Sequence, residues 1–225
     1  NSTTQMYIYE IKERISNYLK TKHSIYENNR IIEPIEEMDE LYYARPEHNE
    51  GSDNVFITPH IDGFFGWIPF MRIWRCIFCV KNPSDTITHF PFQETSHYTL
   101  QNDEFVCHDY NRDLHWISSS SFSNQETRIV YKLHFYDYTF FMKPFASAFK
   151  DINIRYNNFA RNTFLDSISP YETNYSYYLS CMVNGITYFS GYLEYYLGFT
   201  NIGVALLIFY GLKKNRYLFH YTIEF

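Results

Sequence analysis

The sequence has few of the residues from which helical bundles are usually built. Leucine occurs only 13 times and alanine only 5 times in 225 residues. The apolar content comes largely from 23 Tyr, 21 Phe and 3 Trp residues, and aromatic side chains favour pleated strands over helix interfaces. An all-helical fold is therefore disfavoured, and we expect a mainly β protein. An apolar content of 45% in a chain of this length also excludes wholesale disorder.

Basic charge is also in short supply. The chain has 19 Lys and Arg against 25 Asp and Glu, which gives a net charge of −6. Proteins that bind nucleic acid usually carry a basic surface that neutralises phosphates, so a polynucleotide is a poor candidate for the partner. Glycine-rich phosphate loops and the Gly-x-Ser-x-Gly nucleophile elbow are missing too, which leaves nucleotide hydrolysis and acyl transfer without support.

The four cysteines are too few for a disulfide scaffold. Cys76 and Cys79 have the spacing of half a zinc site, but no second pair follows them. Cys107 and Cys181 also lie in apolar or aromatic surroundings. We therefore interpret the cysteines as plain buried thiols, which favours an intracellular reducing compartment.

Composition and the spacing of apolar residues divide the chain into three regions. Residues 1–40 begin with apolar residues at helical spacing between Ile8 and Leu19 and continue into an acidic connector. Residues 41–140 form the predicted core. Residues 141–225 form a C-terminal extension that is rich in aromatic residues and begins with a helix expected to end near Ile168.

The predicted core consists of short β-rich runs separated by turn residues. Eight such strands without intervening helices favour a double-stranded β-helix (jelly roll) or a sandwich over a parallel sheet. The expected strands are residues 41–44, 55–61, 72–80, 86–92, 97–100, 104–110, 114–118 and 128–138.

The extension contains two stretches without charged residues, 173–193 and 195–212. Their length and the charged residues that flank them permit a hairpin that spans a membrane. Polar residues such as Asn174, Asn184 and Thr200 would need partners in lipid, which favours a buried or interfacial helical tail instead. Membrane contact through residues 173–212 and oligomerisation or assembly through the tail are both open at this point.

A candidate metal site begins with the segment His60-Ile61-Asp62. Residues at i and i+2 on a strand point to the same face, so His60 and Asp62 could share one ion. His115 follows Asp62 by 115 − 62 = 53 residues on another predicted strand and supplies a third ligand. His108 is the alternative to His115. Two imidazoles and one carboxylate leave coordination positions open on Fe(II), and they also suit zinc.

A basic residue follows the candidate ligands. Arg128 lies 128 − 115 = 13 residues after His115, and its guanidinium could bind a carboxylate through two hydrogen bonds. Lys132 would share a strand face with Arg128 and could replace it, although a solvated or snorkelling lysine is the simpler interpretation. We interpret Arg75 as part of a surface ion pair, and His134 as a polar surface or hydrogen-bonded core residue.

The ordered set of His60-x-Asp62, His115 and Arg128 on predicted strands resembles the pattern of the 2-oxoglutarate and Fe(II) dependent oxygenases. The resemblance covers about residues 41–140. It implies a jelly roll in which His60, Asp62 and His115 bind Fe(II) and Arg128 binds the co-substrate 2-oxoglutarate. It also implies an oxidoreductase that uses O2 to hydroxylate a peptide, lipid or small molecule that the sequence does not identify. Substrate would be selected by loops such as residues 63–69, whose aromatic residues line an apolar mouth or pack under the tail.

Two other functions fit parts of the sequence. The Asn-, Ile- and Tyr-rich, Ala-poor composition resembles that of proteins from AT-rich genomes such as those of large DNA viruses. This favours, as the main alternative, a non-catalytic jelly-roll structural or interaction protein such as a virion component. The third hypothesis is a metal-dependent lyase or isomerase of the cupin type, which would use the same three ligands without 2-oxoglutarate.

Overall fold

The computed structural model describes residues 2–24, 29–44, 59–66, 68–82, 86–118 and 128–167, together with scattered residues between 178 and 195. Within these ranges the protein is mainly β, with antiparallel sheets and an N-terminal helix. The elements in chain order are α1 (Ser2–Ser24), β1 (Arg30–Pro34), the 3-10 helix η1 (Glu36–Met38), β2 (Glu40–Ala44), β3 (Met71–Lys81), β4 (Ile87–His89), β5 (His97–Thr99), β6 (Phe105–Asp109), β7 (Trp116–Ser118), β8 (Arg128–Thr139), the 3-10 helix η3 (Phe140–Met142) and α3 (Lys143–Ser167).

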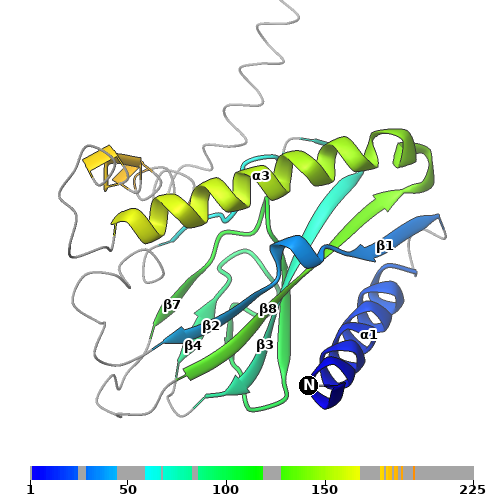
Figure 1. The fold of residues 1–225 in the computed structure, drawn as a ribbon, viewed down its shortest axis with the longest axis horizontal. Helices are drawn as coiled ribbons and strands as arrows, with labels where there is room; N and C mark the ends of the chain where they lie inside the picture. The colour runs from blue at the N-terminus through cyan, green and yellow to red at the C-terminus, as the bar shows by residue number, and fades with distance from the viewer. Residues whose placement is uncertain are drawn as a thin grey trace, which may run out of the picture.

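The larger sheet has the strand order β1-β8-β3-β6, and β2 also pairs with β8. The long strand β8 accommodates both N-terminal strands on one edge, because β2 pairs with residues 128–132 and β1 with residues 135–139. All of these pairings are antiparallel. Figure 1 shows β8 and β3 running side by side through the middle of the molecule.

A smaller sheet has the order β5-β4-β7. Just before β7, His115 forms an isolated antiparallel bridge with His60. The segment that carries His60 therefore lies beside the chain that leads into β7, although it is far away in sequence.

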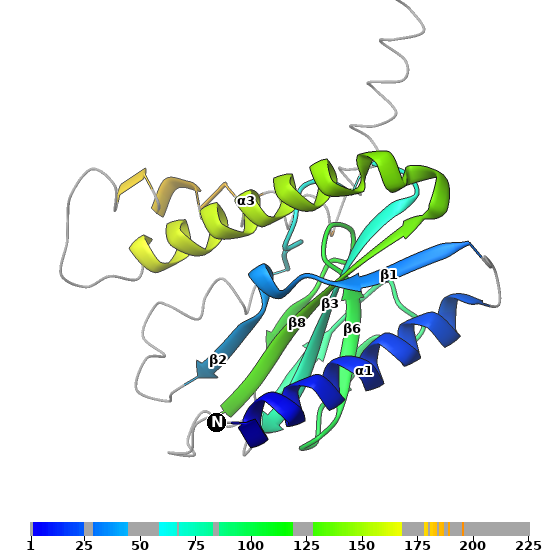
Figure 2. The same cartoon turned by 45° about the vertical axis from the view of Figure 1, so that its right-hand side comes forward.

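One face of the larger sheet packs against α1. Trp74, Cys76 and Phe78 alternate along β3 and point to this face, as the period of two in a strand requires. They form one apolar cluster with residues of α1, among them Ile15 and Leu19, which are fully buried. Each such large apolar side chain contributes about 1.5–3 kcal/mol when it is removed from water. Figures 1 and 2 show α1 and α3 on opposite sides of the strands.

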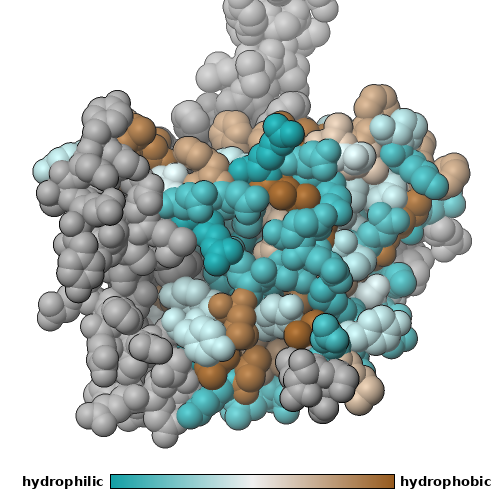
Figure 3. Space-filling view, in the orientation of Figure 1, coloured by the Kyte–Doolittle hydropathy of each residue, from teal (hydrophilic) through white to brown (hydrophobic). Residues whose placement is uncertain are grey.

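The opposite face of the larger sheet has two different neighbours. At one end, Ile73 and Tyr136 form a cluster with Ala146 and Phe149 of α3. At the other end, residues of β3 and β8 pack with Phe90 and other residues of the smaller sheet region. Between these two apolar clusters lies a band of buried polar side chains that belongs to the candidate site. On the side seen in Figure 3 the surface is largely hydrophilic, with apolar patches between the polar side chains.

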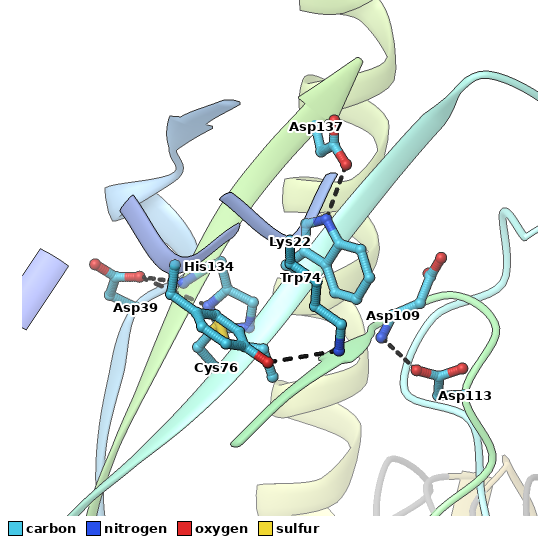
Figure 4. Close-up of a disulfide and its surroundings, with 10 residues drawn as sticks. Lys22, Asp39, Trp74, Cys76, Asp109, Asp113, His134 and Asp137 are labelled. Carbon is cyan, nitrogen blue, oxygen red and sulfur yellow. Dashed lines mark hydrogen bonds and ion pairs between the residues drawn. A yellow bond between two sulfur atoms is a disulfide. The ribbon is translucent and has the colours of Figure 1, made fainter. Parts of the chain in front are cut away.

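The structure contains a disulfide between Cys76 of β3 and Cys107 of β6. The two residues lie directly opposite each other in the register of these strands, on the face that α1 covers. Figure 4 shows Cys76 and its surroundings. The interpretation of these two cysteines as plain thiols is therefore wrong, and the argument for a reducing compartment loses its basis. Cys79, which points to the other face, is a free buried thiol as expected.

Most of the expected elements are confirmed. The N-terminal helix, the strands corresponding to β2 to β8 and the helix that ends near Ile168 all occur. The expected strand 55–61 lies mostly outside the described residues. Strand β1 was missed, because its acidic surroundings and Pro34 made it resemble a connector. The proposed division into three regions stays a prediction.

Most of the stretch 173–212 lies outside the described residues, and the described residues between 178 and 195 are helical. Among the described helices, none has the length and apolar character needed to span a membrane.

Candidate metal centre

The structure brings His60, Asp62 and His115 together. One potential ligand atom from each of the three lies within 4.8 Å of the others, in a group that could hold a metal ion. The backbone sets this arrangement, because His60 and His115 exchange two N–H···O hydrogen bonds of 3.0 Å each. His60 is 7% exposed and His115 is 6% exposed, so the group lies inside the protein.

The hydrogen bonds of His115 determine which of its nitrogens faces the group. Its Nδ1 lies 3.1 Å from the carbonyl oxygen of Asp113, which can only accept, so Nδ1 carries the proton and donates it. This leaves the lone pair of Nε2, which lies 3.4 Å from Asp62 Oδ2. A backbone carbonyl on the second nitrogen is a usual way to orient a histidine that binds metal. Burial, more than the opposing effect of Asp62, lowers the pKa of His115 well below its ordinary value and keeps the ring neutral.

The carboxylate of Asp62 is held through both of its oxygens. Arg75 Nη1 lies 2.8 Å from Oδ1, and His108 Nε2 lies 3.1 Å from Oδ2. Burial alone would favour the neutral acid, but the positive charge of Arg75, with the hydrogen bond from His108, outweighs it and holds the pKa of Asp62 well below its ordinary value. Asp62 is therefore an anion that is ready to bind a cation.

His108 has a different position from His115. Its Nε2 faces the carboxylate of Asp62, to which it donates when that group is ionised, and the ring is fully buried. His108 is not a member of the three-residue group that could hold an ion. The geometry thus favours His115 as the distal ligand and gives His108 the role of orienting Asp62.

Arg75 is not the surface residue that the sequence indicated. It is 7% exposed, and its guanidinium connects Asp62 to two other elements. Nε donates to His134 Nε2 of β8 at 2.8 Å, and Nη2 donates to Asn157 Oδ1 of α3 at 3.2 Å. The interpretation of Arg75 as part of a surface ion pair is wrong, because the strand places it on the inner face of the sheet. His134 is a hydrogen-bonded core residue, one of the two outcomes expected for it.

The segment after Asp62 packs closely against the turn that follows β6. Gly63 N donates to the carbonyl oxygen of Tyr110 at 2.8 Å, and Phe65 N donates to Asn111 Oδ1 at 3.1 Å. A Cβ atom at position 63 would collide with the side chains of Tyr110 and Asn111, so this approach requires glycine. Phe65 also packs edge to face against Tyr156 of α3, while Trp67 lies outside the described residues. The loop therefore packs under α3 at Phe65.

A cavity adjoins the three candidate ligands, and Arg128 is one of the residues that line it. Arg128 is 9% exposed, and its Nε has no hydrogen-bond partner in the described part of the chain. Lys132 lines the same cavity, and its side chain is 12% exposed. The interpretation of Lys132 as a solvated residue is therefore wrong, because it shares the inward face of β8 with Arg128.

The donor set fits a divalent ion of intermediate hardness. Two neutral imidazoles and one ionised carboxylate suit Fe(II), and they suit zinc as well. Three basic side chains and one carboxylate line the cavity, so it is positively charged before any metal ion enters. A comparison with protein-family models and with curated proteins finds no match to this chain. The geometry of the described residues is therefore what any functional proposal rests on.

Proposed function

We propose that this protein is a 2-oxoglutarate and Fe(II) dependent dioxygenase with a jelly-roll core. His60, Asp62 and His115 would hold the iron, and Arg128 would bind the far carboxylate of 2-oxoglutarate. The observation that carries the proposal is the placement of Arg128. Its buried guanidinium lines the same cavity as the three candidate ligands, and its Nε has no partner among the described residues.

The path of the chain supports the jelly-roll part of the proposal. After β2 in the larger sheet, the chain passes the His60 segment beside the smaller sheet, returns to the larger sheet at β3, and then forms β4 and β5 of the smaller one. After that, β6 lies in the larger sheet, β7 in the smaller one and β8 in the larger one again. This repeated alternation between two facing antiparallel sheets is the pattern by which jelly rolls are built.

Electrostatics support an anionic co-substrate. A divalent ion would add two positive charges to a cavity in which basic side chains already outnumber carboxylates. Burying this excess charge is unfavourable unless a bound anion compensates it. A dicarboxylate such as 2-oxoglutarate supplies two negative charges and matches the planar fork of Arg128 with one of its ends.

The residues of the chain would bind and orient the reactants. When bound, Fe(II) would supply the oxidative chemistry, in which O2 and 2-oxoglutarate are converted to succinate and CO2 while one oxygen atom enters a C–H bond of the substrate. Arg75 and His108 would keep the Asp62 carboxylate oriented toward the ion. Burial of the site would limit access of bulk water to it.

The test is purification under anaerobic conditions with Fe(II), followed by addition of 2-oxoglutarate and O2. We expect one iron per chain and release of succinate, at least in slow turnover without a substrate. Asp62→Ala should abolish iron binding, whereas Arg128→Ala should retain iron and mainly raise the concentration of 2-oxoglutarate required. Asp151→Ala and Arg155→Ala are matched controls, because both residues are exposed on α3.

The alternatives give different results in the same assay. Iron binding without succinate formation would contradict the oxygenase proposal and point to a metal-dependent lyase or isomerase. If neither iron binding nor 2-oxoglutarate turnover occurs, and Asp62→Ala and Arg128→Ala behave like their controls, a non-catalytic role follows.

A further inference from the structure

Helix α3 contacts the neighbourhood of the candidate metal centre through a buried amide. The side chain of Asn157 on α3 accepts two hydrogen bonds at its Oδ1, from Arg75 Nη2 at 3.2 Å and from the hydroxyl of Tyr110 at 3.1 Å. Arg75 in turn contacts Asp62 through Nη1 at 2.8 Å. A single side chain therefore separates α3 from one of the candidate ligands.

The guanidinium of Arg75 is held at all three of its nitrogen atoms. His134 accepts from Nε, Asn157 accepts from Nη2, and Asp62 accepts from Nη1. The guanidinium carbon also lies 4.7 Å from the centre of the Tyr110 ring. Because the guanidinium is a rigid planar fork, holding Nε and Nη2 determines where Nη1 points. Asn157 thus takes part in directing Nη1 toward Asp62.

The positive charge of Arg75 is left for Asp62 to compensate. Of the described residues, Asp62 supplies the one carboxylate that forms an ion pair with Arg75. The partner of Nη2, the amide of Asn157, is neutral. A divalent ion at Asp62 would be repelled by the same guanidinium, since two cations would then share one carboxylate. Arg75 therefore both orients Asp62 and competes with the ion for its charge.

The second half of α3 depends on polar contacts of this kind. In the first half, Ala146 and Phe149 are buried in an apolar cluster with the sheet. Further along the described part of the helix, the side chains that reach full burial are those of Asn153, Asn157 and Thr163. A segment with few buried apolar contacts opens at a low free-energy cost, so its hydrogen bonds have a large influence on how firmly it is docked.

We propose that Asn157 is a positioning residue of the metal centre and that, through Arg75, it couples the binding of a divalent ion to the docking of α3. An ion at Asp62 weakens the contact of Arg75 with Asp62 and thereby strengthens its contact with Asn157. The coupling is reciprocal, so firm docking of α3 favours the ion. It goes beyond the proposed function, because it requires a bound divalent ion but no particular reaction.

The affinity for Mn(II), measured by calorimetry on the full chain, tests the role of Asn157. Asn157→Asp gives Arg75 a second carboxylate that draws the guanidinium away from Asp62, so the affinity should rise by about tenfold. Asn157→Leu frees Nη2 to turn toward Asp62 as well, so the affinity should fall by about fivefold. A merely structural role would instead lower the affinity in both variants, because both disturb the same buried contact.

Matched variants control for the added charge. Asn153→Asp adds the same charge to the same buried face of α3 one turn away, where the side chain contacts Asn111 and not Arg75. Asn158→Asp adds it at an exposed neighbouring position and serves as the control if Asn153→Asp does not fold. Each should change the affinity by less than about threefold. Asp62→Ala should abolish Mn(II) binding, which identifies the centre that calorimetry observes.

Hydrogen exchange tests the coupling in the wild type without any substitution. Mn(II) should slow the exchange of backbone amides around residues 153–161 of α3 by about fivefold or more. Exchange in α1, which lies on the other side of the strands (Figures 1 and 2), should not change. In Asn157→Leu, Mn(II) should no longer slow the exchange in α3.

The inference is wrong if Asn157→Asp fails to raise the affinity above that of its controls, if Asn157→Leu does not lower it, or if Mn(II) leaves exchange in α3 unchanged. These outcomes do not affect the proposed function, which depends on succinate formation with Fe(II). If α3 responds to Mn(II) as expected but no succinate forms, the coupling stands and the proposed function is wrong. A wild type that binds no Mn(II) would contradict both.

Discussion

Arg75 Nη1 lies 2.8 Å from Asp62 Oδ1, so a buried guanidinium contacts a carboxylate that belongs to a potential metal-binding group. In the absence of an ion, Arg75 is the main positive charge that keeps Asp62 ionised. A metal ion at this site would therefore share its aspartate with an arginine.

Replacement of Arg75 by Met should destabilise the metal-free protein strongly. Asp62, His134 and Asn157 would lose their donor together, and breaking a buried ion pair costs about 3–5 kcal/mol. Mn(II) should raise the melting temperature of this variant more than that of the wild type, because the ion replaces part of the missing charge. Thermal unfolding with and without Mn(II) measures both effects. Arg72→Met, at a half-exposed position of the same strand, is the control, and equal melting of the two variants would refute the prediction.

Acid should destabilise the protein through His134. Burial lowers the pKa of His134 to about 4, although Asp39 acts in the opposite direction. Between about pH 6.5 and pH 4 the unfolded chain binds a proton at this residue that the folded chain does not, so stability is present above this range and is lost as pH falls through it. His134 should lower the free energy of unfolding by about 2 kcal/mol between about pH 7 and pH 5.

Denaturant unfolding at the two pH values measures the effect of His134. In His134→Gln the decrease in the free energy of unfolding on acidification should be smaller by about this amount, because glutamine still accepts the hydrogen bond of Arg75 but does not titrate. His97→Gln, on the exposed strand β5, should behave like the wild type. An equal acid sensitivity of His134→Gln and wild type would contradict the prediction.

The Cys76–Cys107 disulfide should stabilise the fold. It closes a loop with a sequence separation of 31 residues, for which the chain-entropy estimate is about 3–4 kcal/mol. The double variant Cys76→Ala/Cys107→Ala should lose about this much, and a reducing agent should lower the melting temperature of the wild type but not of the double variant. The prediction is wrong if a reductant converts both cysteines to free thiols but leaves the melting temperature of the wild type unchanged.

Binding of the anionic ligand should weaken at alkaline pH. Burial, together with the charge of Arg75, lowers the pKa of Lys132 to about 8, while Glu40 and Asp62 oppose the shift and Arg128 adds to it. Because only the ammonium form attracts a carboxylate, the affinity for oxalate should fall as pH rises through about 8. Calorimetry on the Mn(II)-loaded chain from about pH 7 to pH 9.5 follows this change.

A matched variant identifies Lys132 as the origin of the alkaline effect. Lys132→Arg keeps its charge throughout this range, so its affinity for oxalate should be nearly flat. If the affinity of Lys132→Arg for oxalate declines with pH as that of the wild type does, another group titrates and Lys132 is not the origin of the alkaline effect.

The sequence predicted the fold well where apolar, β-branched and aromatic residues form long runs. Strands β3 and β8 are recognisable because both faces are buried and their side chains are β-branched or aromatic. Strand β1 escaped detection because it lies on an edge and ends in Pro34, which sequence rules associate with breaks. Its pairing with β8 depends on the partner strand, which local sequence does not reveal.

The candidate ligands could be found from spacing, whereas their neighbours could not. His60 and Asp62 share a short motif, and His115 follows in the expected order. Arg75 and His108 reach the site only through the register of paired strands, and the Cys76–Cys107 bond depends on the same register. Which residues face each other across a sheet is a property of the folded chain, so single-sequence reasoning treated Arg75 as a surface residue.

The backbone bridge between His60 and His115 joins segments that are 115 − 60 = 55 residues apart. An ion bound by both imidazoles would add a second cross-link between the same two segments. Cross-links that close long loops restrict the unfolded chain most. Loading with metal should thus protect the chain around residue 60 against proteases, so that cleavage there would report on occupancy without any knowledge of the substrate.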